Sequence, residues 1–284
     1  MNLVDLVKLF SCVFWMTDDS CLEVGLIKKI SRSRNMYESP ELNDSLYCHN
    51  LGITNVGDLS AFINVSSLIL EQNMIKTLSW VASLRKLKYL NLNCNGLNEL
   101  DLSSGLESLE ELHVTGNSIA RVSCPAQIPL RVLKVGHNKL TEFPDLSSLI
   151  NLECLDLSNN YIASDNYNHF LTCLIPRNIK QLYLSPNPFV ANVSRYRQVT
   201  MVTYRGLNYI DNSPVSVEEI EIARAELARG PDAANAVRRC HIESRQREME
   251  LQMIRFREFQ NSYNEMDELA KELRRFIHDC DCIN

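Results

Sequence analysis

Leucines recur along the chain in short segments that alternate with polar positions. Each segment has a leucine, one variable residue, a second leucine or valine and then an asparagine, so the template reads Leu-x-(Leu/Val)-x-x-Asn-x-(Leu/Ile/Phe). The segments that fit it start at Leu68, Leu90, Leu112, Leu133, Leu155 and Leu182. An earlier unit covers residues 46–53 and has Leu51 where the asparagine should stand. Repetition at about 22 residues indicates a molecule built from stacked copies of one small unit.

The Leu-x-Leu spacing predicts a short strand in each unit. Successive side chains of a strand point to opposite sides, so both leucines face one side and the residue between them faces the other. One unit cannot bury its leucines alone, whereas stacked units share a continuous core. We therefore expect an α/β fold, a solenoid of about seven repeats with a parallel sheet on its concave face.

The repeated asparagine predicts a structural role. Its amide group carries both a donor and an acceptor, so it can satisfy backbone groups at the turn that leaves each strand. We expect these side chains to form a column that runs from repeat to repeat. The members of this asparagine ladder are Asn73, Asn95, Asn117, Asn138, Asn160 and Asn187.

The repeats divide the chain into four regions. They are 1–41, an N-terminal extension with a short helical cap; 42–191, the repeats; 192–215, a cap over the last repeat; and 216–284, a helical tail. Whether residues 1–15 belong to the native protein stays open. The unit between Asn160 and Asn187 is five residues longer than the others, which predicts an outer helix within residues 164–175. In the cap, we expect four residues to cover the last core leucines: Tyr196, Leu207, Tyr209 and Ile210.

The tail has the pattern of two helices. Ser216 begins the first, Gly230 and Pro231 interrupt it, and the second is expected from Asp232 to about His278. Apolar residues in the second helix alternate by three and four, which is the spacing of a coiled-coil seam. Self-association and packing against the solenoid both stay open. The seam residues are Phe256, Phe259, Tyr263, Met266, Ala270, Leu273 and Ile277.

The composition and the short motifs argue against several classes of function. The 29 basic and 35 acidic residues give a net charge of −6, which argues against nucleic-acid binding because phosphates require a basic surface. The apolar stretch at residues 3–15 is too short to span a bilayer, and the ten scattered cysteines indicate reduced thiols. The sequence has no phosphate-binding loop or nucleophile elbow, and the cluster at 278–282 has no second pair of zinc ligands. We expect no enzymatic activity, no metal and no cofactor.

A partner-binding surface is the remaining class of function. The residues that flank and separate the strand leucines would lie on the concave face, and tyrosines mixed with few charges are typical of protein interfaces. A solvated sheet without a partner is the alternative. The predicted concave-face residues are Tyr47, His49, Ile69, Glu71, Tyr89, Asn91, Glu111, His113, Lys134, Asp156, Gln181 and Tyr183.

Two resemblances follow from these residues. The repeats resemble the 22-residue leucine-rich repeats of intracellular proteins, and residues 194–215 are similar to the cysteine-free cap of that group. More specific segments, namely 39–47, 192–197, 207–215 and 225–230, together resemble the leucine-rich-repeat member of the dynein axonemal assembly factor family. This resemblance implies a scaffold in the cytoplasm that helps chaperones or co-chaperones preassemble axonemal dynein chains for motile cilia or flagella.

Three other functions use similar repeats. A structural axonemal component, such as a dynein regulatory or light-chain-like protein, would remain with detergent-extracted axonemes. A regulator of protein phosphatase 1 would bind the phosphatase catalytic subunit. A spliceosomal scaffold is disfavoured because no basic surface is visible, and nuclear exclusion of the protein would dismiss it.

Overall fold

The computed structural model describes residues 21–103, 106–124, 127–163, 166–174, 178–204 and 206–281, with side chains described as far as Arg274. The residues 1–15 considered above lie outside this part. The chain separates into two compact units, residues 1–216 and 217–284.

Short strands and few helices make up the first unit. The largest sheet has nine strands in the order β13-β12-β11-β10-β9-β7-β5-β4-β2. Its strands are β2 (Ser45–Tyr47), β4 (Ser67–Ile69), β5 (Tyr89–Asn91), β7 (Glu111–His113), β9 (Val132–Lys134), β10 (Cys154–Asp156), β11 (Gln181–Tyr183), β12 (Tyr209–Ile210) and β13 (Ser213–Pro214). All neighbouring pairs are parallel except the last, β12 with β13. The expected leucine-rich-repeat solenoid with a parallel sheet is confirmed.

The central leucine of each strand forms one continuous core column. Leu68 pairs in register with Leu46 on one side and with Leu90 on the other, and the alignment continues to Ile210. These side chains are fully buried. Burial of each contributes about 1.5–3 kcal/mol, and truncation to alanine in such a core costs about 2–5 kcal/mol.

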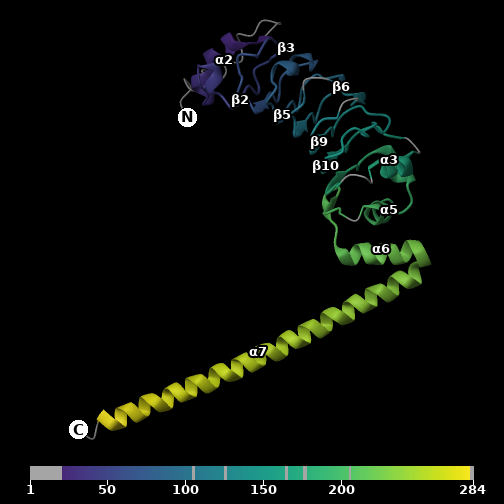
Figure 1. The fold of residues 1–284 in the computed structure, drawn as a ribbon. Coiled ribbons are helices and arrows are strands. Elements are labelled where there is room, and N and C mark those ends of the chain that lie inside the picture. The colour runs from purple at the N-terminus through teal and green to yellow at the C-terminus, as the bar shows by residue number, and fades with distance from the viewer. Residues whose placement is uncertain are drawn as a thin grey trace, which may run out of the picture. The chain divides into compact units, whose positions relative to one another are not determined.

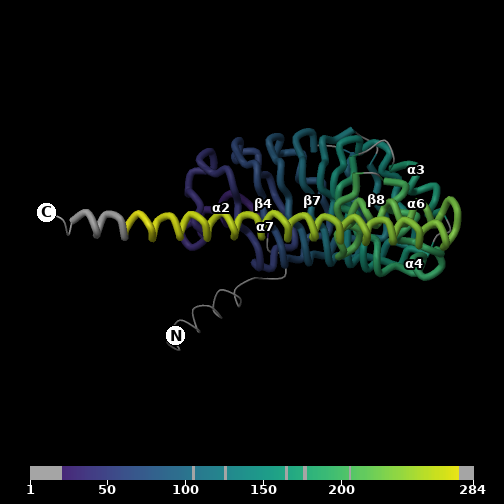
Figure 2. The backbone as a smooth tube through the Cα atoms, turned by 90° about the horizontal axis from the view of Figure 1, so that it is seen from below, coloured from purple at the N-terminus to yellow at the C-terminus, as the bar shows by residue number. Residues whose placement is uncertain are grey.

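Other elements form the outer side of the curve, opposite the nine-stranded sheet (Figure 1). Two small parallel sheets lie there, one of β1 (Cys21–Leu22) with β3 (Asn55–Val56) and one of β6 (Glu99–Asp101) with β8 (Arg121–Ser123). Short helices complete the N-terminal repeats: α2 (Val24–Ile30), η1 (Ser31–Arg34), η2 (Pro40–Leu42) and η3 (Ser79–Ser83). Figure 2 shows the resulting coils stacked side by side.

The longer repeat contains the expected outer helix, α3 (Tyr167–Leu174). Its apolar face packs into an aromatic cluster, because Phe170 stacks on Phe143 with ring centroids 4.3 Å apart and Tyr167 stacks on Phe189 at 5.2 Å. Tyr196 joins the cluster at 5.7 Å from Tyr167. Burial raises the pKa of the Tyr167 phenol, which keeps it neutral in this apolar setting.

The C-terminal cap covers the last repeat with α4 (Pro188–Asn192), α5 (Tyr196–Thr203) and the strand pair β12–β13. Leu207 and Ile210 are buried, as expected of residues that cover core leucines. The prediction for Tyr209 was wrong, since its side chain is 43% exposed. Tyr209 precedes Ile210 in β12, and strand alternation turns it to the opposite face of the sheet.

The second unit is a pair of helices, α6 (Val217–Arg229) and α7 (Pro231–Asp281). Gly230 joins them at a φ of +87°, a value that glycine adopts without steric cost. The prediction placed the second helix at Asp232, whereas Pro231 is its first residue, because proline fits the first helical turn. Polar contacts join α7 to α6: Arg245 forms an ion pair with Glu218 at 2.9 Å, and His241 Nε2 lies 3.0 Å from Glu221 Oε2.

Candidate protein-binding surface on the inner sheet

The outward residues of the nine-stranded sheet form two columns. Because the core leucine is the middle residue of each three-residue strand, its two neighbours point away from the core. Strand register aligns the first residues as one column, from Ser45 to Gln181, and the third residues as another, from Tyr47 to Tyr183. A third column lies two residues beyond each strand and begins with His49 and Glu71. We call these three columns the inner face.

Polar contacts link neighbouring repeats at the centre of the inner face. The Tyr89 hydroxyl lies 3.4 Å from His113 Nδ1, and the two rings meet edge to face at a centroid distance of 5.2 Å. The Asn91 amide donates to Glu71 Oε2 at 3.2 Å, and Asn91 is only 7% exposed. Asn91 therefore acts mainly within the sheet and offers little surface to a partner.

Burial and charge set the protonation of this central part. Burial, followed by the positive charge of Lys134, lowers the pKa of His113 to about 4, so its imidazole is neutral at pH 7. Glu111 lies 3.9 Å from His113 Nε2, and this contact is an ion pair only when the imidazole is protonated. Burial also raises the pKa of Tyr89, with a smaller effect from the Glu111 charge. The centre of the inner face therefore holds two neutral rings, Tyr89 and His113, with the charged residues Glu71, Glu111 and Lys134 on the same and neighbouring repeats.

Tyrosines also lie at both ends of the inner face. Tyr47 is 39% exposed in the first strand, and Tyr183 and Tyr209 lie on neighbouring strands at the other end. Between them, Asp156 accepts hydrogen bonds from the backbone and side chain of Ser158. Gly136 lies under this carboxylate, since a Cβ built there would come within 3.0 Å of Asp156 Oδ2. A substitution at Gly136 would therefore displace Asp156.

The predicted concave-face residues all lie on the inner face. His113 and Tyr89 come into contact, as do Glu71 and Asn91, whereas His49 contacts Arg34 at 2.9 Å away from the others. The sequence analysis missed several members of the same columns. Each directly precedes the core residue of its strand, and this position could have been identified in every repeat. These are Ser45, Ser67, Val132, Cys154 and Tyr209.

The asparagine ladder lies behind the sheet at the turns. Asn138 Oδ1 accepts from the Ile119 backbone N–H at 2.9 Å, and its Nδ2 donates to three carbonyls, each at 3.0 Å. Asn73 makes the same kind of bridge to the first unit, where it accepts from the N–H groups of Leu51 and Ile53. Equivalent contacts occur at Asn95, Asn117, Asn160 and Asn187.

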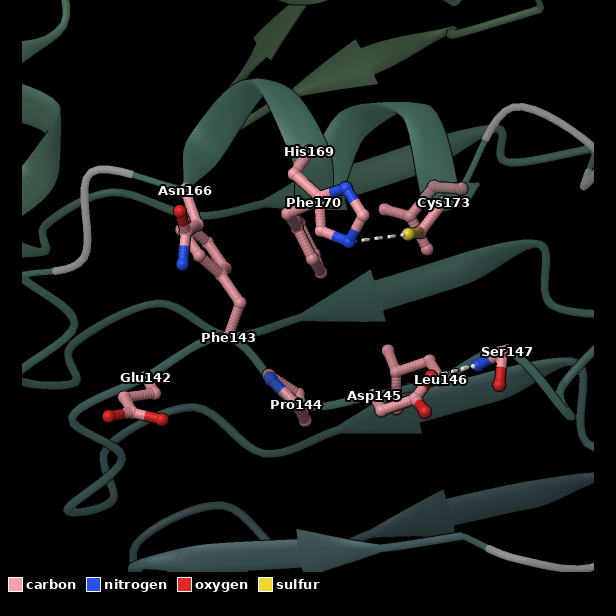
Figure 3. A pocket seen from close by; sticks show the side chains of 11 residues that line it. Glu142, Phe143, Pro144, Asp145, Leu146, Ser147, Asn166, His169, Phe170 and Cys173 are labelled. Atoms are coloured by element: carbon pink, nitrogen blue, oxygen red, sulfur yellow. Dashed lines mark hydrogen bonds between the residues drawn. The ribbon is translucent and has the colours of Figure 1, made fainter.

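A hollow of about 430 Å³ lies on the outer side, between α3 and residues 142–147 (Figure 3). Its wall is largely apolar, with Phe143 and Phe170 prominent, and His169 Nε2 lies 3.6 Å from Cys173 Sγ at its edge. No group of three or more residues able to hold a metal ion occurs among the described residues. The apolar wall of the hollow suits an apolar group.

The predicted coiled-coil seam lies on α7. Phe256, Phe259, Tyr263, Met266 and Leu273 are all more than half exposed, and the side chain of Ile277 lies outside the described residues, as does the cluster at 278–282. None of the helices in the described part of the chain is long and apolar enough to cross a membrane.

Comparison with known proteins finds relatives with leucine-rich repeats. A family model described as Leucine Rich Repeat matches residues 151–182. Leucine-rich repeat-containing protein ODA7 of Chlamydomonas reinhardtii is 29% identical over 223 residues, which is 77% of this chain and 51% of that protein. The dynein axonemal assembly factor 1 homolog of Drosophila melanogaster is 29% identical over 205 residues, 70% of this chain and 14% of that protein.

Relatives of another kind match as well. Keratocan of Gallus gallus is 27% identical over 199 residues, 60% of this chain and 56% of that protein. Among solved structures, the functional domain of InlJ from Listeria monocytogenes covers 71% of this chain and 40% of its own, at 23% identity and a TM-score of 0.48. The chain spans about half the length of the Chlamydomonas and chicken relatives. The chain therefore has a leucine-rich-repeat fold, and its sequence is similar to dynein assembly factors and, over fewer residues, to keratocan.

Proposed function

We propose that this protein is a non-enzymatic scaffold that binds protein partners through its inner face and takes part in the preassembly of axonemal dynein arms. The observation that carries the binding role is the inner face itself. The twelve residues predicted from sequence to contact a partner fall on three adjoining columns of one curved sheet. Solenoids of this kind characteristically use such extended concave surfaces for binding.

The chemistry of the inner face suits a protein partner. Aromatic rings lie at both ends and in the centre, and the charged groups are few and of both signs. Aromatic residues provide large contact area with little loss of conformational entropy, and scattered charges fix orientation. A uniformly basic surface, which nucleic acid requires, is not what these columns present.

The dynein-related part of the proposal rests on sequence similarity. The matches to ODA7 and to the fly assembly factor homologs extend over 70–77% of this chain, a larger share than the 60% of the keratocan match. On that basis the partners are axonemal dynein chains, or the chaperones and co-chaperones that handle them, in the cytoplasm of ciliated or flagellated cells.

Fractionation of flagellated cells tests this role. The tagged full chain is purified separately from cytoplasmic extract and from detergent-extracted axonemes, and the bound proteins are identified by mass spectrometry. Preassembly predicts a cytoplasmic pool that carries dynein chains and chaperones, and loss of dynein arms when the protein is removed.

The competing functions predict different results. A structural axonemal component would stay with the extracted axonemes, and a phosphatase regulator would carry the phosphatase catalytic subunit in place of dynein chains. Either result, or intact dynein arms in cells that lack the protein, would contradict the assembly role.

A further inference from the structure

Helix α7 presents a long apolar surface that α6, the other helix of its unit, does not cover. Every described side chain from Ile242 to Arg274 is exposed. Phe259, Tyr263 and Met266 are 66–68% exposed, although they are among the largest apolar side chains of the molecule. Exposed apolar surface on this scale marks an interaction site.

The apolar residues of α7 follow a heptad pattern. Counting Phe256 as position a and Phe259 as position d, the other a positions are Ile242, Met249, Tyr263 and Ala270, and the other d positions are Arg245, Gln252, Met266 and Leu273. Two further exposed apolar residues, Leu251 and Ile254, fall at positions c and f, away from this seam. The seam is therefore continuous from Phe256 to Leu273, and these two residues provide matched controls.

A hollow on the seam has the form that a second helix would fill. It is lined by Phe259, Ser262, Tyr263, Met266 and Asp267. The first four of these occupy positions d, g, a and d, and four residues in this arrangement make the hole that receives one side chain of a facing helix in a coiled coil. The expected occupant is therefore an α-helix with its own apolar seam.

Charge along α7 favours a second copy of the same helix in the opposite direction. Residues 238–257 contain six arginines and three glutamates, a net charge of 6 − 3 = +3. Residues 258–281 contain seven acidic and three basic residues, a net charge of 3 − 7 = −4. An antiparallel pair places each basic part beside an acidic part, whereas a parallel pair places like charges together. Antiparallel helix dipoles also attract.

One antiparallel alignment matches the side chains of the seam. With the two-fold axis at Asn261, Phe259 faces Tyr263 of the second copy, and Phe256 faces its Met266. These are aromatic–aromatic and sulfur–aromatic contacts, both favourable. In the next layer the long side chain of Gln252 lies over the small Ala270. We propose that α7 forms an antiparallel coiled coil with α7 of a second copy of this protein, centred near Asn261.

Analytical ultracentrifugation of the full chain over a range of concentrations tests the proposal. We expect a monomer–dimer equilibrium. The double substitution Phe259→Gln and Tyr263→Gln removes the two central rings, so the dissociation constant should rise by about a hundredfold or more. The control Leu251→Gln with Ile254→Gln changes apolar residues off the seam that are also more than half exposed, and should leave the constant within about threefold.

Two results would overturn self-association through this seam. A full chain that stays monomeric at all concentrations excludes a second copy as the occupant, and leaves a helix of another protein or the solenoid itself. A dimer that is unaffected by the Phe259 and Tyr263 substitutions must form through a different surface.

The direction of the two helices is tested through charge. Arg255→Glu with Arg257→Glu changes the net charge of residues 238–257 from +3 to 3 − 4 = −1. The antiparallel dimer should weaken by about tenfold at low salt and the effect should vanish at high salt, since it is electrostatic. Arg85→Glu with Arg121→Glu makes the same total change on the solenoid and is the control. A dimer that tightens after the α7 substitution would show that the helices are parallel.

Discussion

At the scale of single residues, each ladder asparagine connects two repeats with one amide. Asn138 is 4% exposed, and its amide group serves one N–H and three carbonyl groups. A hydrophobic side chain of the same size would leave these backbone groups buried and unsatisfied, at a cost of about 1–3 kcal/mol each. This requirement explains why the asparagine recurs when its neighbours vary.

We expect Asn138→Ala to lower the free energy of unfolding by about 2–4 kcal/mol, because some of the exposed backbone groups will find water. The midpoint of urea denaturation measures the change. Asn98→Ala, at an exposed position two repeats earlier, is the control and should shift stability by less than about 0.5 kcal/mol. Equal effects of the two substitutions would contradict a structural ladder.

His113 makes the free energy of unfolding depend on pH. Its pKa is lowered in the folded protein to about 4 from 6.5, so the unfolded chain takes up a proton first as the pH falls. The stability present above pH 6.5 should therefore decrease between pH 6.5 and 4. We expect a contribution of about 1–2 kcal/mol, reduced from the full linkage value because part of the ring is exposed.

The His113→Gln variant, which does not titrate, measures this contribution. Urea denaturation of both proteins at pH 7 and at pH 4 gives the difference. The variant should lose less stability between the two pH values than the wild-type protein does. The same loss in both proteins would show that His113 is not the group that responds.

At the scale of elements, the aromatic cluster holds α3 on the solenoid. Phe170 is 4% exposed and stacks on Phe143 from the preceding repeat. Its ring fills the space between α3 of the longer repeat and the preceding repeat, and a smaller side chain would leave a void there. The helix and the C-terminal cap are thereby linked through Tyr167 and Tyr196.

We expect Phe170→Ala to destabilise the first unit by about 3–5 kcal/mol, because it removes a buried ring and leaves a cavity. Differential scanning calorimetry of the full chain would detect the lower melting temperature. Tyr161→Ala removes an aromatic ring that is 63% exposed and is the matched control. A melting temperature that responds equally to both changes would argue against the cluster.

The sequence predicts the strands and the order of the repeats well, because a period of two is a local pattern. Leu68 and Leu90 lie in one core column, and the Leu-x-Leu spacing within each repeat is enough to predict that each faces the core. Tyr209 was expected to cover the last core leucines together with its neighbour Ile210, but adjacent strand residues face opposite sides. Which of the two faces the core depends on how β12 pairs with β11, and no local pattern gives that.

The exposed fractions of the inner-face side chains could not be predicted from the sequence either. Asn91 and Tyr47 occupy equivalent positions in their strands, yet Asn91 is 7% exposed and Tyr47 is 39% exposed. Neighbouring repeats cover Asn91 on both sides, whereas Tyr47 lies on β2, at the edge of the sheet. The hollow beside α3 was missed for a similar reason, since its wall comes from two repeats that are brought together by folding.

At the scale of the whole molecule, the first unit is a preformed surface and the second is a long helix with an apolar seam. Stability of a solenoid comes from contacts between neighbouring repeats, so the exposed columns of the inner face can vary without loss of the fold. Binding specificity can therefore reside in inner-face charges such as Glu71 and Lys134, which are not needed for the core.

Capture of partners by inner-face variants tests this account most directly. Glu71→Lys with Lys134→Glu reverses two inner-face charges and leaves the net charge unchanged. Glu99→Lys with Arg121→Glu does the same on the small outer sheet of β6 and β8, where both residues are exposed. Urea denaturation first establishes that both variants are folded. From extracts of flagellated cells, we expect the inner-face variant to recover about tenfold less dynein and chaperone than wild-type protein, and the outer-sheet variant to recover a normal amount. Normal recovery by the inner-face variant, or loss with the outer-sheet variant alone, would contradict binding through the inner face.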